Sequence, residues 1–302
     1  MGLFGGYENT GPGINPYAPK KKPFFRFWEL LWRNFSKLLA LNLLFTVCHA
    51  PLLLSLIVLI ETDNNLTNVM TIALLVIQFI IEGPVLAGCT RILRLIVLDK
   101  AFFMTEEFKK GFSKNFGMAF LVWCLDAIVA ASLLAGYWVY PALAESTGSK
   151  LVYIPYGISI AVGLLLLFMN FYLLPLQVAT TLKQRSVFKN SFMLACISPK
   201  QCFITLGGIV LMLGICVLLL MINSYLMFLF AFFPAAFIGY LVLFVNYPVI
   251  QKYVINPYYE DTGEQNPEEE ETQPDEERVF TDRGGTETPV KKQKQKKGKV
   301  IS

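Results

Sequence analysis

Charged residues are scarce in this sequence of 302 residues, since Asp, Glu, Lys and Arg make up 16% of it, whereas a soluble domain usually carries about 25%. The chain has one histidine, and its six cysteines include no CxxC pair, so it lacks the usual ligand sets of a zinc site or a redox dithiol. No HExxH, GxSxG or P-loop sequence occurs. These absences argue against an enzyme, against a metal or other cofactor, and against a site for ATP in this chain.

Apolar sequence, in contrast, is abundant and occurs in long runs. Five stretches contain at most one charged residue each: 38–60, 66–90, 116–144, 151–182 and 201–251. About 20 apolar residues suffice for a helix to cross a bilayer, and lipid offers no partner to an unpaired backbone group, so each crossing must be a helix. The last stretch is long enough for two crossings, with Asn223 and Ser224 able to turn the chain. We therefore predict an all-α polytopic membrane protein with six transmembrane helices, at about 38–60, 66–90, 117–140, 151–180, 203–222 and 227–250.

An aromatic and basic segment precedes each pair of crossings. Aromatic side chains recur at helical spacing in three places, from Phe24 to Phe35, from Phe108 to Phe116, and at Phe188 and Phe192. Amphipathic helices of this composition lie in the membrane interface. The crossings thus form three hairpins, each preceded by an interfacial helix. Whether the hairpins are true internal repeats stays open, because any protein with six crossings has basic loops on one side.

Proline interrupts the second crossing of each predicted hairpin. The three residues are Pro84, Pro175 and Pro248. A proline inside a helix removes one hydrogen bond and bends the helix, so we expect three kinks at similar depth.

Positive charge is concentrated on one side of the predicted membrane. Sixteen of the 26 lysines and arginines fall in 1–37, 91–114 and 183–200, whereas the opposite loops contain only Lys150. Because lysine and arginine accumulate in short cytoplasmic loops, both termini are predicted to be cytoplasmic. The basic residues predicted to lie at the membrane surface are Arg26, Arg33, Lys37, Arg91, Arg94, Lys109, Lys110, Lys114, Lys183 and Arg185.

A few polar residues lie within the predicted crossings and form the candidate site. They are Glu82, Asp126, Asn42, Asn170, Asn246 and His49. Ionisable groups in a crossing usually face a bundle interior or water, so this set could line a polar cavity open to the cytosol. In a functional interpretation, Glu82 and Asp126 bind a proton, a cation or a substrate. In a structural interpretation, which we favour, they hold helices together through hydrogen bonds, and His49 is a satisfied core residue.

The two ends of the chain differ in composition from the middle. We divide the sequence into a flexible N-terminal segment (1–23), a transmembrane domain (24–255) and a disordered cytoplasmic tail (256–302). The tail is acidic from Glu268 onward and then basic from Lys291 to Lys299, and such sequence cannot bury enough apolar surface to fold alone. The basic end lacks the aromatic interleaving of a nucleic-acid site, so nucleic acid is not an expected partner.

Several strings over residues 1–260 resemble the YesL-like integral membrane proteins of Gram-positive bacteria. They are MGLFGGYENTGPGINP, KKKPFFRFWELLWRNFSKLLALNLLF, EGPVLAGCTRILR and NYPVIQKY. This family is a domain of unknown function whose members are commonly encoded near carbohydrate ABC transporters. The resemblance implies a multi-pass protein of the plasma membrane that acts as an accessory or regulatory partner of a carbohydrate ABC-type uptake system. It supplies no catalytic residues.

The expected partners are the lipid bilayer and either ABC transporter subunits or further copies of the chain. The alternative function is a passive or ion-coupled small-molecule transporter or channel that uses the polar cavity.

Overall fold

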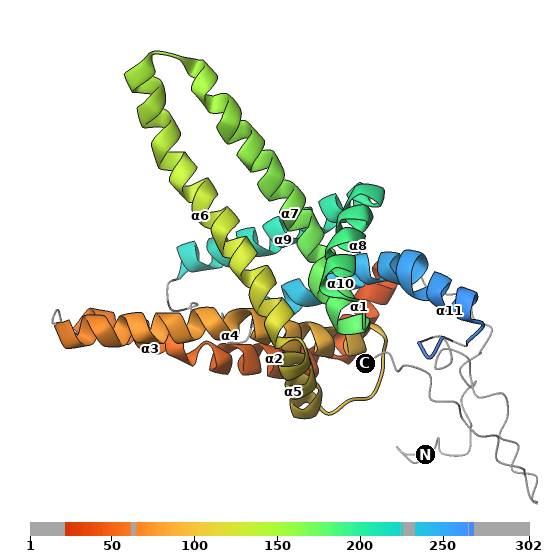
Figure 1. The fold of residues 1–302 in the computed structure, drawn as a ribbon. Helices are drawn as coiled ribbons and strands as arrows, with labels where there is room; N and C mark the ends of the chain where they lie inside the picture. The colour runs from red at the N-terminus through yellow and green to blue at the C-terminus, as the bar shows by residue number, and fades with distance from the viewer. Residues whose placement is uncertain (1–21, 62–64, 224, 226–232, 265, 269–302) are drawn as a thin grey trace, which may run out of the picture.

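The computed structural model describes residues 22–61, 65–223, 225, 233–264 and 266–268, and it contains no strand among them (Figure 1). The helices in chain order are α1 (Pro23–Arg33), α2 (Phe35–Cys48), α3 (Ala50–Glu61), α4 (Asn65–Val97), α5 (Met104–Lys114), α6 (Phe116–Thr147), η1 (Lys150–Val152), α7 (Tyr153–Ala179), α8 (Gln184–Ile197), α9 (Pro199–Ile222), α10 (Ala235–Ile250), η3 (Gln251–Ile255) and α11 (Asn256–Thr262). The predicted all-α polytopic fold is confirmed.

The helices supply up to six membrane crossings within the part of the chain that the structure describes. Five are long and apolar enough by themselves: α4, α6, α7 with η1, α9, and α10 with η3 and α11. The sixth is the pair α2 and α3, which meet at His49 with a bend of 49°. Pro51 is the second residue of α3 and has no N–H to continue the α2 ladder, which accounts for the break. The chain is therefore a multi-pass membrane protein.

A short helix precedes each hairpin, as the sequence predicts. One polar residue separates α1 from α2, α5 from α6, and α8 from α9, and its side chain donates a hydrogen bond to the carbonyl four residues earlier. The three bonds are Asn34 Nδ2 to Leu30 O at 3.2 Å, Asn115 Nδ2 to Gly111 O at 3.0 Å, and Ser198 Oγ to Leu194 O at 2.6 Å. At two of the junctions the same carbonyl also accepts the backbone N–H of the junction residue, from Asn34 to Leu30 O and from Ser198 to Leu194 O, both at 3.0 Å. This shared junction supports the hypothesis of internal repetition.

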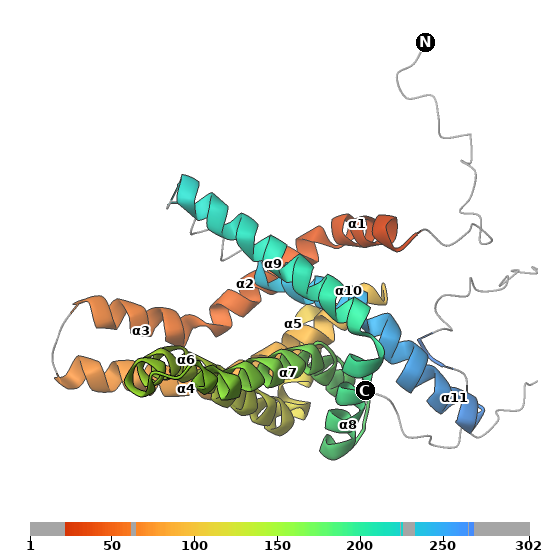
Figure 2. The same cartoon turned by 90° about the horizontal axis from the view of Figure 1, so that it is seen from above.

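The three hairpins pack together at one end and spread apart at the other: Figure 1 shows α6–α7 diverging from α3–α4, and Figure 2 shows α9 diverging from both. Fully buried side chains gather in the second halves of α4 and α7 and along α10, for example Ile92, Tyr172 and Tyr240. In the apolar windows of α7 and α9, by comparison, only 11% of the residues are buried. We call the end that contains Pro84, Pro175 and Pro248 the packed end, and the opposite end of the hairpins the open end.

The proline-containing helices differ among themselves. The α-helix continues through Pro84 in α4 and through Pro175 in α7. After Pro248, in contrast, α10 ends at Ile250 and passes into the π-helical segment η3. π-Helical turns are one of the ways in which a helix absorbs a local break in its hydrogen-bond ladder.

The start of the tail also differs from the expectation that residues 256–302 are disordered. The chain remains helical through α11 to Thr262, and Gly263 then takes a φ of 66°, a left-handed conformation that glycine adopts readily. Residues 266–268 lie against the packed end. Residues 1–21 of the predicted flexible N-terminal segment, residues 226–232 before α10, and residues 269–302 of the tail lie outside the described residues.

Candidate functional site

Glu82 lies in α4 directly before Gly83 and Pro84, and it faces the break between α2 and α3. Its Oε2 is 3.0 Å from His49 Nε2 and accepts a hydrogen bond from Gln78 Nε2 at 2.6 Å. The other ring nitrogen of His49, Nδ1, lies 2.8 Å from the carbonyl oxygen of Phe45. All these groups are buried or partly buried.

Both ring nitrogens of His49 face an oxygen atom, and this restricts where protons can lie between His49 and Glu82. A neutral imidazole has one donor nitrogen and one acceptor nitrogen, whereas both nitrogens of His49 face oxygen atoms. Nδ1 can only donate to the Phe45 carbonyl, so the contact between Nε2 and Glu82 also needs a proton. That proton sits either on the imidazole or on the carboxyl group. The contact between His49 and Glu82 is thus a hydrogen bond within the membrane domain.

Asp126 and Asn170 form a second polar pair, between α6 and α7. Asn170 Nδ2 donates to Asp126 Oδ1 at 2.6 Å, and both side chains are partly buried. This bond joins the two helices of the second hairpin. Two helix turns toward the packed end, Gln177 Nε2 of α7 donates to the carbonyl of Asn115 at 3.0 Å and ties α7 to the start of α6.

Asn42 and Asn246 are fully buried and each joins separate elements. Asn42 Oδ1 in α2 accepts a hydrogen bond from the backbone N–H of Ala236 at 2.8 Å, one of the N–H groups at the start of α10 that has no partner within the helix. Asn246 Nδ2 in α10 donates to Thr205 Oγ1 in α9 at 2.8 Å.

The hydrogen bonds thus place the six predicted residues in four groups, and each group joins different elements. The sequence had suggested one shared cavity. The pairing of His49 with Glu82 was missed, although each residue lies two positions before a proline, Pro51 or Pro84, where a helix leaves a backbone carbonyl without its usual partner. The bonds are those that the structural interpretation requires, and a functional role for Glu82 and Asp126 stays a prediction.

Two of the ten basic residues predicted for the membrane surface are buried instead. The side chains of Arg91 and Arg94 are 11% and 8% exposed. Both arginines lie in the last turns of α4, and the charge pattern of the sequence does not reveal the acidic partners that bury them. The other eight are exposed or partly exposed: Arg26, Arg33, Lys37, Lys109, Lys110, Lys114, Lys183 and Arg185.

Arg91 is buried by α5, which packs closely on α4. Arg91 Nε donates to Glu107 Oε2 at 2.6 Å, and Lys110 Nζ donates to Glu107 Oε1 at 2.8 Å. Burial alone would raise the pKa of Glu107, but the hydrogen bonds and positive charges of Lys110 and Arg91 outweigh it and hold that pKa below its ordinary value. The helices approach closely where Gly88 and Gly111 face each other.

Arg94 is buried beside Glu268 of the tail. Its Nη2 donates to Glu268 Oε1 at 2.5 Å, and the same oxygen accepts from Tyr247 Oη at 2.6 Å. Gln251 Nε2 of η3 donates to Glu268 Oε2 at 2.9 Å. Burial would raise the pKa of Glu268, but the positive charge of Arg94 and the three hydrogen bonds hold it below its ordinary value. Sequence reasoning missed this group because Glu268 is one of four consecutive glutamates in a segment with a disordered composition.

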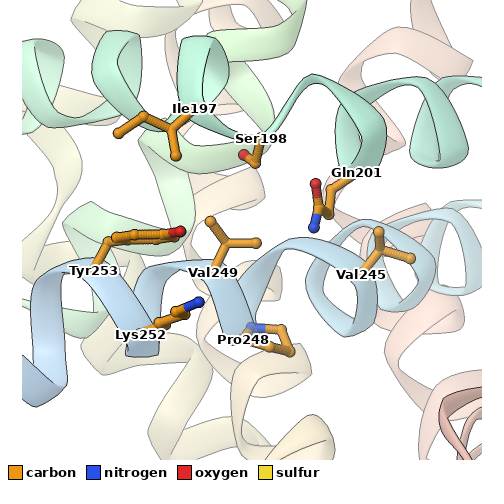
Figure 3. A pocket seen from close by; sticks show the side chains of 8 residues that line it. All are labelled: Ile197, Ser198, Gln201, Val245, Pro248, Val249, Lys252 and Tyr253. Atoms are coloured by element: carbon orange, nitrogen blue, oxygen red, sulfur yellow. The ribbon is translucent and has the colours of Figure 1, made fainter.

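A pocket of about 250 Å³ opens at the packed end between the α8–α9 junction and α10 with η3 (Figure 3). It is lined by Ile197, Ser198, Gln201, Val245, Pro248, Val249, Lys252 and Tyr253. Lys252 Nζ lies 5.2 Å from the ring centre of Tyr253, and Ser198 Oγ is already bonded to Tyr172 Oη at 2.5 Å. Of the predicted site and kink residues, only Pro248 lines this pocket.

No protein-family model matches this sequence, and neither the curated proteins nor the solved structures contain a match.

Proposed function

We propose that this protein is an accessory or regulatory subunit that binds another integral membrane protein. The resemblance to YesL-like proteins indicates a carbohydrate ABC-type uptake system in the plasma membrane as the partner. The distribution of lysine and arginine favours an orientation with both termini of this chain in the cytoplasm. The observation that carries the proposal is the divergence of the hairpins. Their open ends present long apolar helices that have few contacts with the rest of the chain, whereas the packed end holds the fold together.

The distribution of polar groups supports a binding role over a passage for solutes. A transporter needs a polar route on both sides of the membrane, and the polar pairs lie toward the packed end, where each is already engaged with a neighbouring helix. Toward the open end, the exposed side chains of α6 and α7 are mainly apolar and aromatic, among them Trp138, Leu134 and Ile158. Such surfaces suit lateral contact with other membrane helices, which associate through packing.

Photo-crosslinking from a single position tests this proposal. Trp138 is 75% exposed at the open end of α6, so a photoreactive phenylalanine analogue there reaches whatever covers this face in native membranes. The matched control is the same analogue at Tyr156, whose ring stacks on Tyr140 at 5.1 Å within the hairpin. We expect position 138 to give an adduct that contains a transporter subunit, and position 156 to give only crosslinks within the chain. Adducts of position 138 with lipid alone would contradict the proposal, and an adduct with a second copy would replace the partner by a homo-oligomer.

Ion-coupled transport is the second candidate, and the hydrogen-bonded pair of ionisable residues His49 and Glu82 is the observation that favours it. The pair lies at the broken crossing α2–α3, and discontinuous helices form ion sites in several transporter folds. Vesicles that contain the purified protein and an internal pH-sensitive dye test it under an imposed membrane potential. This function requires proton flux that the wild type supports and Glu82→Gln abolishes. Wild-type flux equal to that of empty vesicles would exclude proton coupling.

A further inference from the structure

We propose that Arg94, Tyr247 and Gln251 form a carboxylate-binding seat at the packed end, and that the tail of the same chain fills this seat with Glu268 and so locks α4 to α10. The inference goes beyond the accessory role and is independent of it, since it concerns contacts within one chain.

The seat is built from groups that face a single carboxylate. Arg94 comes from α4, Tyr247 from α10 and Gln251 from η3, and together they donate three hydrogen bonds of 2.5 to 2.9 Å to the two oxygens of Glu268. Arg94 Nε also donates to Tyr247 Oη at 2.7 Å, which fixes the guanidinium against the hydroxyl. A cation, a hydroxyl and an amide that converge on two oxygens match the shape of a carboxylate.

Burial makes an anion necessary at this position. Arg94 is 7% exposed and Glu268 is 8% exposed, so neither charge is solvated by bulk water. Removing one partner of a buried ion pair leaves an uncompensated charge, which is much more costly than losing an exposed pair. The seat therefore favours the state in which a carboxylate occupies it.

The path of the chain delivers Glu268 to the seat. Gly263 ends α11 in a left-handed conformation and turns the chain, and three further hydrogen bonds hold residues 266–268. Asn266 Nδ2 donates to Asn256 Oδ1 at 3.1 Å, the N–H of Glu268 donates to Asn266 Oδ1 at 2.9 Å, and Lys100 Nζ donates to the carbonyl of Pro267 at 3.1 Å. Residues 266–268 are thus connected both to the start of α11, through Asn256, and to the segment after α4, through Lys100.

Docking of Glu268 joins two of the three proline-containing helices at the end where they lie beside each other. Pro84 interrupts the hydrogen-bond ladder of α4, and Pro248 precedes the π-helical segment of α10, so both helices have a weakened point on the way to the seat. With the seat filled, the ends of α4 and η3 are fixed to each other. With the tail released, they are free to move apart.

Hydrogen–deuterium exchange of the full chain in lipid nanodiscs tests the lock. The first variant is Glu268→Gln. The second changes all four glutamates at 268–271 to glutamine, because a neighbouring glutamate could otherwise replace Glu268 in the seat. The matched control is Glu264→Gln, which removes the same charge from an exposed position in the same tail.

We expect the fourfold variant to increase the exchange rates of the Asn266 and Glu268 amides by about tenfold or more, a factor that corresponds to ~1.4 kcal/mol. Amides in η3 and α11 should also exchange faster, because the seat connects to both, whereas Glu264→Gln should leave both regions unchanged. The proposal is overturned if the Asn266 and Glu268 amides exchange equally fast in the wild type and in the fourfold variant. It is also overturned if Glu264→Gln has the same effect as the fourfold change.

Discussion

Gly83 lies where α4 crosses the start of α6, and replacing it by alanine should separate these two helices. A Cβ atom built at Gly83 would lie 2.3 Å from the carbonyl oxygen of Ala119 and 2.7 Å from its carbonyl carbon. Ordinary contacts of a Cβ atom are 3.4–4 Å, so the α6 backbone must move by about 1 Å. The clash involves main-chain atoms, which cannot rotate away as a flexible side chain could.

The expected loss of stability follows from the cost of overpacking. Extra atoms in a well-packed interior typically cost about 1–3 kcal/mol. Alanine also has a higher helix propensity than glycine, by at most about 1 kcal/mol, and this gain offsets part of the loss. The matched control is Gly117→Ala in α6, where a Cβ atom meets nothing within 4 Å, so only the gain in propensity applies. We expect Gly83→Ala to be less stable than Gly117→Ala by about 2 kcal/mol.

The two variants are compared by equilibrium unfolding in mixed detergent micelles, followed through the fluorescence of the four tryptophans. Equal free energies of unfolding for Gly83→Ala and Gly117→Ala would refute the reasoning, because they would show that α4 and α6 do not approach closely at this point.

Three further predictions follow from single features of the structure. Cys196 is the exposed cysteine on α8, so a membrane-impermeant maleimide should label it in inverted vesicles and not in right-side-out vesicles if the packed end faces the cytosol. The pair Asp126 and Asn170 should show a coupling energy of about 0.6–2 kcal/mol in a double-mutant cycle with Asp126→Leu and Asn170→Leu. Since the pKa of Glu107 is lower in the folded protein than in the unfolded chain, its interactions with Lys110 and Arg91 should stabilise the fold above the unfolded pKa, and this contribution should be lost as the pH falls through the folded pKa.

Each of these predictions has a control. Labelling of Cys196 from the opposite side would reverse the predicted orientation, and Cys202, which is fully buried, should stay unlabelled in both preparations. A coupling energy near zero would mean that Asp126 and Asn170 do not interact in the membrane. For Glu107, the comparison is the pH dependence of unfolding in Glu107→Gln, which should lack the acid loss attributed to this residue. An unchanged pH profile would contradict that assignment.

The crossings were predictable because their signal is local. A bilayer requires about 20 apolar residues in each helix, so the length of an uncharged run and the position of the next charge define a crossing without knowledge of its neighbours. The short helices α1, α5 and α8 were predictable for the same reason, since aromatic residues at spacings of three and four define a face. The break at His49 was not predicted, although Pro51 lies inside the predicted crossing 38–60 and a proline inside a helix can bend it; the bend is 49°.

The pairing of polar residues was not predictable to the same extent. The set Glu82, Asp126, Asn42, Asn170 and Asn246 was identified because polar groups in a crossing are expensive, but the sequence does not say which of them meet. Their partners lie up to 194 residues away, as for the bond between Asn42 and Ala236. Composition wrongly predicted that the first residues of the tail are disordered. A single buried carboxylate, that of Glu268, holds a short segment in place without changing the average polarity of the tail.

α4 carries more of these interactions than any other described helix, and this concentration has a consequence for function. Its second half holds Glu82 against the broken crossing, Gly83 against α6, Arg91 against α5 and Arg94 against the tail. Interactions that hold the fold together therefore meet at the packed end, within a few turns of one helix. The open ends of the hairpins contribute little burial, so their surroundings can change without unfolding the domain. We therefore propose that the open ends bind lateral partners while Glu268 of the tail, through Arg94, holds the helices together at the packed end.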